Sequence, residues 1–61
     1  MNDEISVVIV DDEAASIRNL SNDLCAYSDI RILETTTSVE KARKIVTRQQ
    51  PDLLFLDVEM P

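Results

Sequence analysis

The sequence predicts an α/β fold in which a small parallel sheet carries helices on both faces. Two apolar runs, Val7 to Val10 and Leu53 to Leu56, lack the alternation of a half-exposed strand and are typical of strands covered on both faces. Between them lie two amphipathic stretches and a third strand-like segment, so the expected order is β-α-β-α-β. No repeat, low-complexity tract or linker interrupts residues 1–61, which we expect to form one unit.

The first half of the chain predicts a strand, a turn and a helix. Ile5 to Val10 is the expected first strand, and Asp11 to Glu13 form the turn after it. Ala14 to Tyr27 is the expected helix, because its apolar residues recur at helical spacing. These residues are Ile17, Leu20 and Leu24. Acids in the turn suit the positive N-terminus of that helix, and Tyr27 is expected to pack its ring at the helix end.

The second half begins with a strand near the edge of the sheet. Ile30 to Thr36 is rich in β-branched residues and alternates only in part, which favours a partly exposed strand. Thr37-Ser38-Val39-Glu40 has the form of a capping box, in which a hydroxyl and a Glu three residues later satisfy free backbone donors. We therefore expect a second helix to begin there.

This second helix should bury one stripe and expose another. The expected buried residues are Val39, Ala42, Ile45 and Val46, and the expected exposed ones are Lys41, Arg43, Lys44 and Arg48. Gln50-Pro51 ends the helix, because proline cannot continue the hydrogen-bond ladder. The third strand then starts near Asp52, with Leu53 and Phe55 in the core.

The order of the strands follows from the handedness of their connections. Right-handed crossovers place the two helices on opposite faces when the second and third strands flank the first. This 2-1-3 order begins a flavodoxin-like, doubly wound sheet, in which ligands bind at the carboxyl edge of the strands. The first and third strands then become neighbours, about 4.8 Å apart.

Acidic residues follow both of these neighbouring strands. Asp11 and Asp12 come after the first strand, and Asp57 ends the third, so three carboxylates should converge at one edge. At an effective dielectric constant near 20, each pair repels by roughly 4 kcal/mol at 4 Å. A divalent cation would relieve this repulsion, and oxygen-only ligands suit Mg²⁺ better than zinc. The pattern predicts a magnesium site and Asp57 as a phosphoryl acceptor.

Composition excludes several other classes of function. Twelve acids against six bases give a net charge of −6, which argues against nucleic acid or an anionic membrane as a direct partner. The chain has no glycine, which excludes a P-loop or a dinucleotide-binding fingerprint. Cys25 is the only cysteine, and no signal peptide or membrane-length apolar run is present, so we expect a cytoplasmic protein.

The acidic pair Asp11-Asp12 and the run Leu56-Asp57-Val58-Glu59-Met60-Pro61 resemble the receiver domain of bacterial two-component response regulators. Both motifs occur in the right order, separated by two βα units. The sequence of residues 51–57 is similar to the corresponding segment in receivers of the LytTR transcription-factor class. The resemblance covers the whole chain, and it implies that residues 1–61 are the N-terminal half of such a domain.

The resemblance also implies roles for individual residues. Asp57 would accept a phosphoryl group from a phosphohistidine on a sensor histidine kinase. Asp12 and Asp57 would bind Mg²⁺ directly, Asp11 would act partly through water, and the main-chain carbonyl of Glu59 would complete the protein ligands. The chain would then be a signalling module rather than an enzyme, and the full-length protein a transcriptional regulator.

Two alternatives remain open. Asp57-Val58-Glu59 superficially fits an aspartyl-nucleophile phosphohydrolase, although the nucleophile of such enzymes usually ends the first strand. The chain would instead be an inert structural fragment if the hydroxyl and lysine residues that the family places in its second half are required for phosphorylation. A half-domain would also leave its third strand as an exposed edge, so we expect either self-association or a partly disordered monomer.

Overall fold

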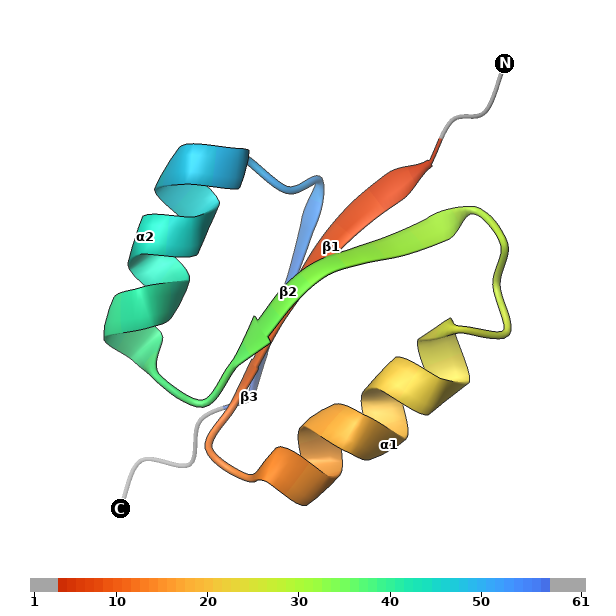
Figure 1. The fold of residues 1–61 in the computed structure, drawn as a ribbon, viewed down its shortest axis with the longest axis horizontal. Helices are drawn as coiled ribbons and strands as arrows, with labels where there is room; N and C mark the ends of the chain where they lie inside the picture. Colours follow the sequence, from red (N-terminus) through yellow and green to blue (C-terminus); the bar gives the residue numbers. More distant parts are fainter. Residues whose placement is uncertain (1–3, 58–61) are drawn as a thin grey trace.

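The computed structural model describes residues 4–57, which form a three-stranded parallel sheet with one helix on each face (Figure 1). In chain order the elements are β1 (Ile5–Asp11), α1 (Ala14–Leu24), β2 (Ile30–Thr36), α2 (Val39–Gln49) and β3 (Leu53–Asp57). The strands lie in the order β2-β1-β3, and both neighbours run parallel to β1. The predicted α/β class, the β-α-β-α-β order and the 2-1-3 start of a flavodoxin-like sheet are confirmed.

β1 is the centre of the fold because it is paired on both edges and covered on both faces. All four side chains from Val7 to Val10 are at most 1% exposed. Alternate residues of the strand serve two separate cores. On the α2 face the core consists of Val8, Val10, Ala42 and Ile45, with Leu33 beside it. On the α1 face it consists of Val7, Ile9 and Leu24, flanked by Ile17, Leu20, Ile30, Ile32 and Phe55.

α1 ends earlier than the sequence predicts. The helix stops at Leu24 rather than Tyr27, and Cys25 is its C-cap. Backbone N–H groups beyond it bond three residues back, Ala26 to Asp23 and Tyr27 to Leu24, which tightens the last turn and ends the helix. The Tyr27 side chain is 59% exposed, so the predicted packing of its ring is wrong.

α2 begins one residue later than the predicted capping box requires. Ser38, not Thr37, is the N-cap, and its Oγ accepts a 3.3 Å bond from the backbone N–H of Lys41. With the cap at Ser38, Glu40 occupies the second helical position, and Lys41 takes the third, from which a Glu would reach back. The helix therefore has a hydroxyl cap without the reciprocal half of the box.

The other end of α2 uses an unusual residue for its turn. Gln50 takes the left-handed conformation with φ 47°, and its N–H bonds to the carbonyl of Val46 at 2.9 Å. Glycine is the usual choice there, and a chain without glycine stores about 1 to 2 kcal/mol of backbone strain at this position. In the helix stripe, Ala42 and Ile45 are buried as predicted, whereas Val39 is 48% exposed.

β3 lies at an edge of the described sheet, and its side chains are exposed on both faces. Leu53, Leu54 and Leu56 are 44%, 42% and 58% exposed, so the prediction that Leu53 belongs to the core is wrong. Phe55 does pack against the core on the α1 face, as predicted. The physical reason is that both helices pack over β1 and β2 and leave the β3 side of the sheet largely uncovered.

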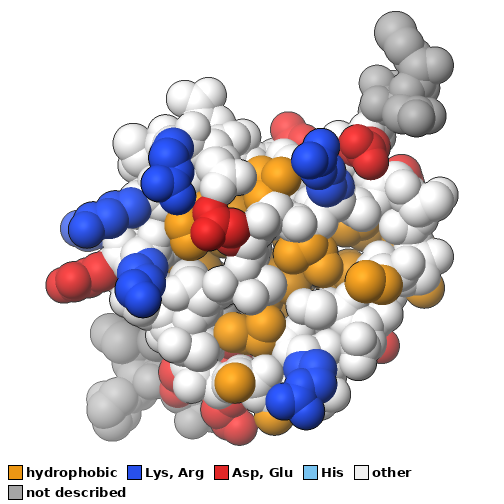
Figure 2. Space-filling view, viewed as in Figure 1, with side chains coloured by type: hydrophobic (Ala, Val, Ile, Leu, Met, Phe, Trp, Pro, Cys, Tyr) orange, Lys and Arg blue, Asp and Glu red, His pale blue; other side chains and the backbone are white. Residues whose placement is uncertain are grey.

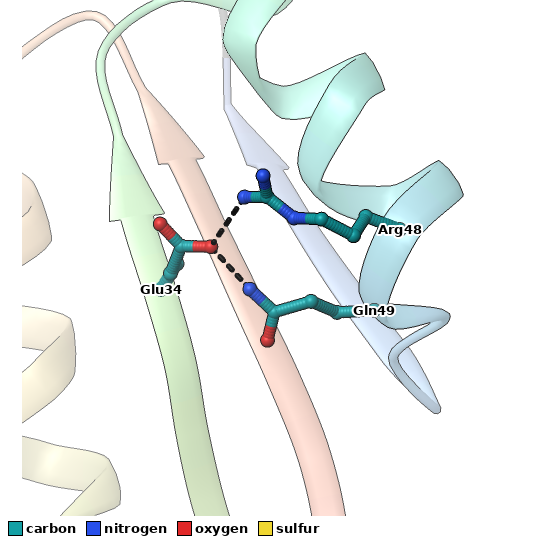
Figure 3. A network of polar contacts seen from close by, with 3 residues as sticks. All are labelled: Glu34, Arg48 and Gln49. Carbon is teal, nitrogen blue, oxygen red and sulfur yellow. Dashed lines mark hydrogen bonds and ion pairs between the residues drawn. The ribbon is translucent and has the colours of Figure 1, made fainter.

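β2 contains a bulge that sequence periodicity does not reveal. Val7 pairs with Ile32 but Val8 pairs with Glu34, so Leu33 is the extra residue. Leu33 packs on the α2 core, and Glu34 also turns to α2, where its carboxylate accepts a bond from Gln49 and lies 3.6 Å from Arg48 (Figure 3). A bulge lets consecutive side chains share one face in this way.

Most of the basic side chains lie on α2. The four cations of α2 are exposed, and Figure 2 shows Lys and Arg side chains gathered over this helix, as the sequence predicts. Neither helix in residues 4–57 is long and apolar enough to cross a membrane.

Candidate functional site

The carboxyl ends of β1 and β3 lie side by side, which is the arrangement that the acidic-site prediction requires. Five consecutive residue pairs join the two strands, from Val7 with Leu53 to Asp11 with Asp57. Asp11 and Asp57 are thus the last residues of their strands and are register partners. Neighbouring strands lie about 4.8 Å apart, so the two backbones at this edge are one strand spacing from each other.

Asp11 is the buried acid of the site, at 8% exposure. Its Oδ1 accepts a 2.9 Å hydrogen bond from the backbone N–H of Glu13, which closes the turn from β1 into α1. This bond explains how a carboxylate is held at the end of a buried strand, because it satisfies one oxygen locally. The bond uses Oδ1, and Oδ2 is the oxygen left for another partner.

Asp12 lies in the same turn and is exposed. The turn runs directly into α1, whose N-cap is Glu13. Glu13 caps with its carbonyl, which accepts from Ile17 N–H at 3.2 Å, and its side chain makes no capping bond. The positive end of α1 therefore lies beside Asp12 and favours negative charge there.

The carboxyl end of β2 lies at the same edge and contributes a hydroxyl residue. Thr36 ends β2 and pairs with Val10, one residue before Asp11. Its Oγ1 accepts a 3.1 Å bond from Ser38 N–H, so it shapes the turn into α2 as Asp11 shapes the turn into α1. The same local device, a short polar side chain at a strand end that accepts from the residue two positions later, thus builds both loops of this edge.

An open groove of about 420 Å³ runs from Asp11 along the side of α1 towards β3. Its polar lining comes from Ser16, Asn19 and Asp23, and the apolar remainder is Ile9, Val10, Leu20, Phe55 and Leu56. Sequence reasoning missed this polar stripe. The signal was present, because the three polar residues are spaced i, i+3 and i+7 beside the apolar stripe of the same helix.

Part of the predicted site lies outside what the structure describes. Glu59, whose carbonyl was a predicted ligand, falls beyond the described residues, and for Asp57 only the backbone is described. Among the side chains described in residues 4–56, no three Asp, Glu, His or Cys gather closely enough to hold a metal ion. Two acids of the predicted site are described, the buried Asp11 and the exposed Asp12. Their carboxylate oxygens are donors that fit Mg²⁺.

Comparison with known proteins decides the family. The family model for the response regulator receiver domain matches residues 7–61. The chain belongs to the receiver domain family. Receiver domains are signalling modules that sensor histidine kinases phosphorylate and that generally bind Mg²⁺ for the reaction. No solved structure gave a significant match to the chain.

Several curated relatives share this receiver segment. An uncharacterized response regulatory protein of Shewanella oneidensis is 35% identical, and the transcriptional regulatory protein BtsR of Escherichia coli is 40% identical. A protein-glutamate methylesterase/protein-glutamine glutaminase of Myxococcus xanthus is 39% identical. Each match covers 93% of this chain but only 24%, 24% and 16% of the respective relative. The chain thus spans a quarter or less of these proteins, whose named activities differ.

Proposed function

We propose that this receiver segment accepts a phosphoryl group on Asp57, at a site that Asp11 and Asp12 share. The observation that carries the proposal is the β1–β3 register, which makes Asp57 the partner of Asp11 at the carboxyl edge. Ligands of open parallel sheets bind at this edge. Residues 1–61 would then contribute the phosphoacceptor half of a receiver domain.

The described geometry supports separate roles for the two N-terminal acids. Asp11 commits Oδ1 to the Glu13 N–H and is buried, so it would act on a cation partly through water. Asp12 is exposed in the turn and would be a direct ligand together with Asp57 and the Glu59 carbonyl. Mg²⁺ held by these groups would neutralise charge on the phosphoryl oxygens.

Phosphoryl transfer requires little of the protein beyond alignment of the reacting groups and neutralisation of their charge. A carboxylate oxygen of Asp57 attacks the phosphorus of a phosphohistidine, and the P–N bond breaks as the O–P bond forms. The imidazole leaves with the electron pair and takes up a proton. Phosphoryl transfer is catalysed mainly by positioning and electrostatic stabilisation, which fits a rigid strand end as the acceptor.

The wider setting of the proposal rests on the family. A sensor histidine kinase would be the phosphoryl donor, in the cytoplasm, and the chain would not turn over a substrate as an enzyme. The likeness to BtsR, a transcriptional regulatory protein, favours a transcriptional regulator as the full-length protein. The LytTR class rests on the sequence of residues 51–57 alone. The methylesterase likeness favours an enzymatic output domain instead, and the output domain that accompanies the receiver decides between them.

The test uses acetyl phosphate and Mg²⁺ as the phosphoryl donor mixture. We expect one phosphoryl group per chain, stable in acid and labile in base, mapped to Asp57 by mass spectrometry. Asp57→Asn should abolish the adduct, and Asp12→Asn should reduce its rate of formation at least tenfold. Asp29→Asn is the matched control, since it removes the same charge from an exposed residue in the turn before β2.

The outcomes separate the alternatives. Steady phosphate release over many turnovers would favour the aspartyl-nucleophile hydrolase. Mg²⁺ binding without an adduct would favour an inert structural fragment and contradict the proposal. An adduct on any other carboxylate would contradict it as well.

We also propose that the 61-residue chain by itself self-associates through β3. Within residues 4–57 this strand pairs only with β1, and three of its leucines are exposed. An open strand edge with apolar residues on both faces invites pairing with another strand. Sedimentation that is independent of concentration would contradict this proposal.

A further inference from the structure

A compact polar contact joins the starts of β1 and β3, at the end of the sheet opposite the acids. Asp52 Oδ2 accepts a 2.9 Å bond from the backbone N–H of Ser6 and a 3.0 Å bond from the Ser6 hydroxyl. In return, Ser6 Oγ accepts a 2.9 Å bond from the backbone N–H of Asp52. Three hydrogen bonds therefore connect two residues that are 46 positions apart in sequence.

The contact lies at the amino end of the β1–β3 pairing and continues the same register. The first pair of the ladder is Val7 with Leu53, so Ser6 and Asp52 are the pair immediately before it. Counting five residues forward from each member of the pair reaches Asp11 and Asp57, the last pair of the ladder. The Ser6–Asp52 contact and the Asp11–Asp57 pair therefore lie at opposite ends of the same β1–β3 ladder.

The apolar residues of β3 cannot set this register by themselves. Leu53 to Leu56 are apolar at every position, so they lack the alternation that normally makes a one-residue slip costly. Three of the four are more than 40% exposed, which weakens any preference that packing would impose. A directional contact has to supply the specificity that the hydrophobic pattern lacks.

We propose that Ser6 and Asp52 form a register lock, and that Asp52 is a positioning residue for the phosphoacceptor Asp57. The inference rests on the proposed function of Asp57. A slip of one residue would displace Asp57 by about 3.3 Å along β1 relative to Asp11. Functional groups need to be held within about 0.5 Å of their productive positions, so a slipped strand would leave the site unformed.

The charge of Asp52 is consistent with this role but does not act on the site directly. The hydrogen bond from Ser6 N–H, followed by the one from the Ser6 hydroxyl, lowers the pKa of the Asp52 carboxyl. Asp52 therefore stays ionised and keeps its acceptor oxygen free of a proton at neutral pH. Five residues of strand separate it from the acidic end by about 17 Å, or two Debye lengths at physiological salt. Any effect on Asp57 must therefore travel through the backbone.

Three substitutions in the full chain test the lock. Asp52→Ala removes both bonds to Oδ2, whereas Asp52→Asn can keep both, because the amide oxygen can occupy the position of Oδ2. Ser6→Ala keeps the backbone Ser6 N–H bond and loses the two that involve the hydroxyl. Asp29→Asn again serves as the control for charge, because it also lies at the amino end of the sheet.

The first readout is the register itself, measured by nuclear Overhauser effects between the amides of β1 and β3. We expect Asp52→Asn to keep the wild-type cross-strand contacts. Asp52→Ala should show shifted or multiple contacts. A single wild-type register in Asp52→Ala would overturn the lock, whatever the function of Asp57. Should Asp52→Ala not fold, the same criterion applies to Ser6→Ala.

The second readout is Mg²⁺ affinity and the acetyl phosphate reaction rate, both expressed per folded molecule. We expect at least a tenfold loss in Asp52→Ala, a smaller loss in Ser6→Ala and a change of less than twofold in Asp52→Asn and Asp29→Asn. Ala42→Gly, which weakens the α2 core without touching the lock, should leave both values per folded molecule unchanged. An equal loss in Ala42→Gly would overturn the positioning role. A wild-type chain that binds no Mg²⁺ and accepts no phosphoryl group would refute the proposed function while leaving the register test intact.

Discussion

Asp11→Asn should make the protein more stable without Mg²⁺ and less responsive to Mg²⁺. Asn keeps an Oδ1 that can accept the 2.9 Å bond from Glu13 N–H, so the turn into α1 is preserved while one charge is removed. Two charges one strand spacing apart, about 4.8 Å, repel by about 0.9 kcal/mol at a dielectric constant of 80 and about 3.5 kcal/mol at 20. The edge is partly open to water, so a gain of about 1 kcal/mol is expected.

Mg²⁺ reverses the order of the two proteins. A ligand that binds only the folded state adds about 2.7 kcal/mol to the free energy of unfolding at a concentration one hundred times its Kd. The wild type should gain this amount at saturating Mg²⁺. Asp11→Asn has lost a charged member of the site and should gain less than half of it. The variant is then the more stable protein in EDTA and the less stable one in Mg²⁺.

Urea unfolding in EDTA and in 10-fold steps of Mg²⁺ concentration measures both effects. Asp29→Asn removes the same charge at the opposite end of the sheet and should leave the Mg²⁺ response unchanged. The reasoning is refuted if Asp11→Asn is destabilised in EDTA or keeps the full wild-type response to Mg²⁺. Either result would mean that Asp11 is a turn residue and takes no part in an acidic site.

Three further outcomes follow from other parts of the molecule. Because the folded-state pKa of Asp52 is lowered, its stabilising contribution is present above the usual aspartate pKa of about 3.9 and is lost as pH falls through the lowered value. Acid unfolding monitored by circular dichroism should therefore show a shallower pH dependence in Asp52→Asn below about pH 4. Ile9→Ala should cost about 2 to 5 kcal/mol in urea, because this side chain is 1% exposed in the α1-side core, and Leu20→Ala should cost less. Leu54→Lys should leave the fold intact and abolish concentration-dependent sedimentation if β3 is the surface that self-associates.

The fold could be predicted from the sequence because its strongest signals are local and agree with its topology. The four consecutive β-branched residues from Val7 to Val10 indicate a strand buried on both faces, and the structure covers both faces with helices. The strand order follows from handedness rather than from any single residue. Neither the buried-strand pattern nor the handedness rule changes when the predicted end of a helix or strand is wrong by a few residues.

Details that depend on one contact could not be predicted in the same way. The shift of the α2 cap from Thr37 to Ser38 reflects a choice between adjacent hydroxyls that sequence spacing cannot make. The β2 bulge at Leu33 becomes visible only when β2 is laid against β1. The packing of β3 was overestimated because an apolar run shows that a strand can be covered and does not show what covers it.

Asp52 illustrates why a site can depend on residues that motif reading assigns to structure alone. From sequence it is simply the acid that precedes the third strand, and its partner Ser6 is an unremarkable polar residue near the start of the first. In the fold the two residues bind each other through three hydrogen bonds, in the same β1–β3 register that pairs Asp11 with Asp57. A strand that is apolar at every position packs almost equally well in several registers, so the accuracy of an acidic pair at one end has to come from polar bonds at the other.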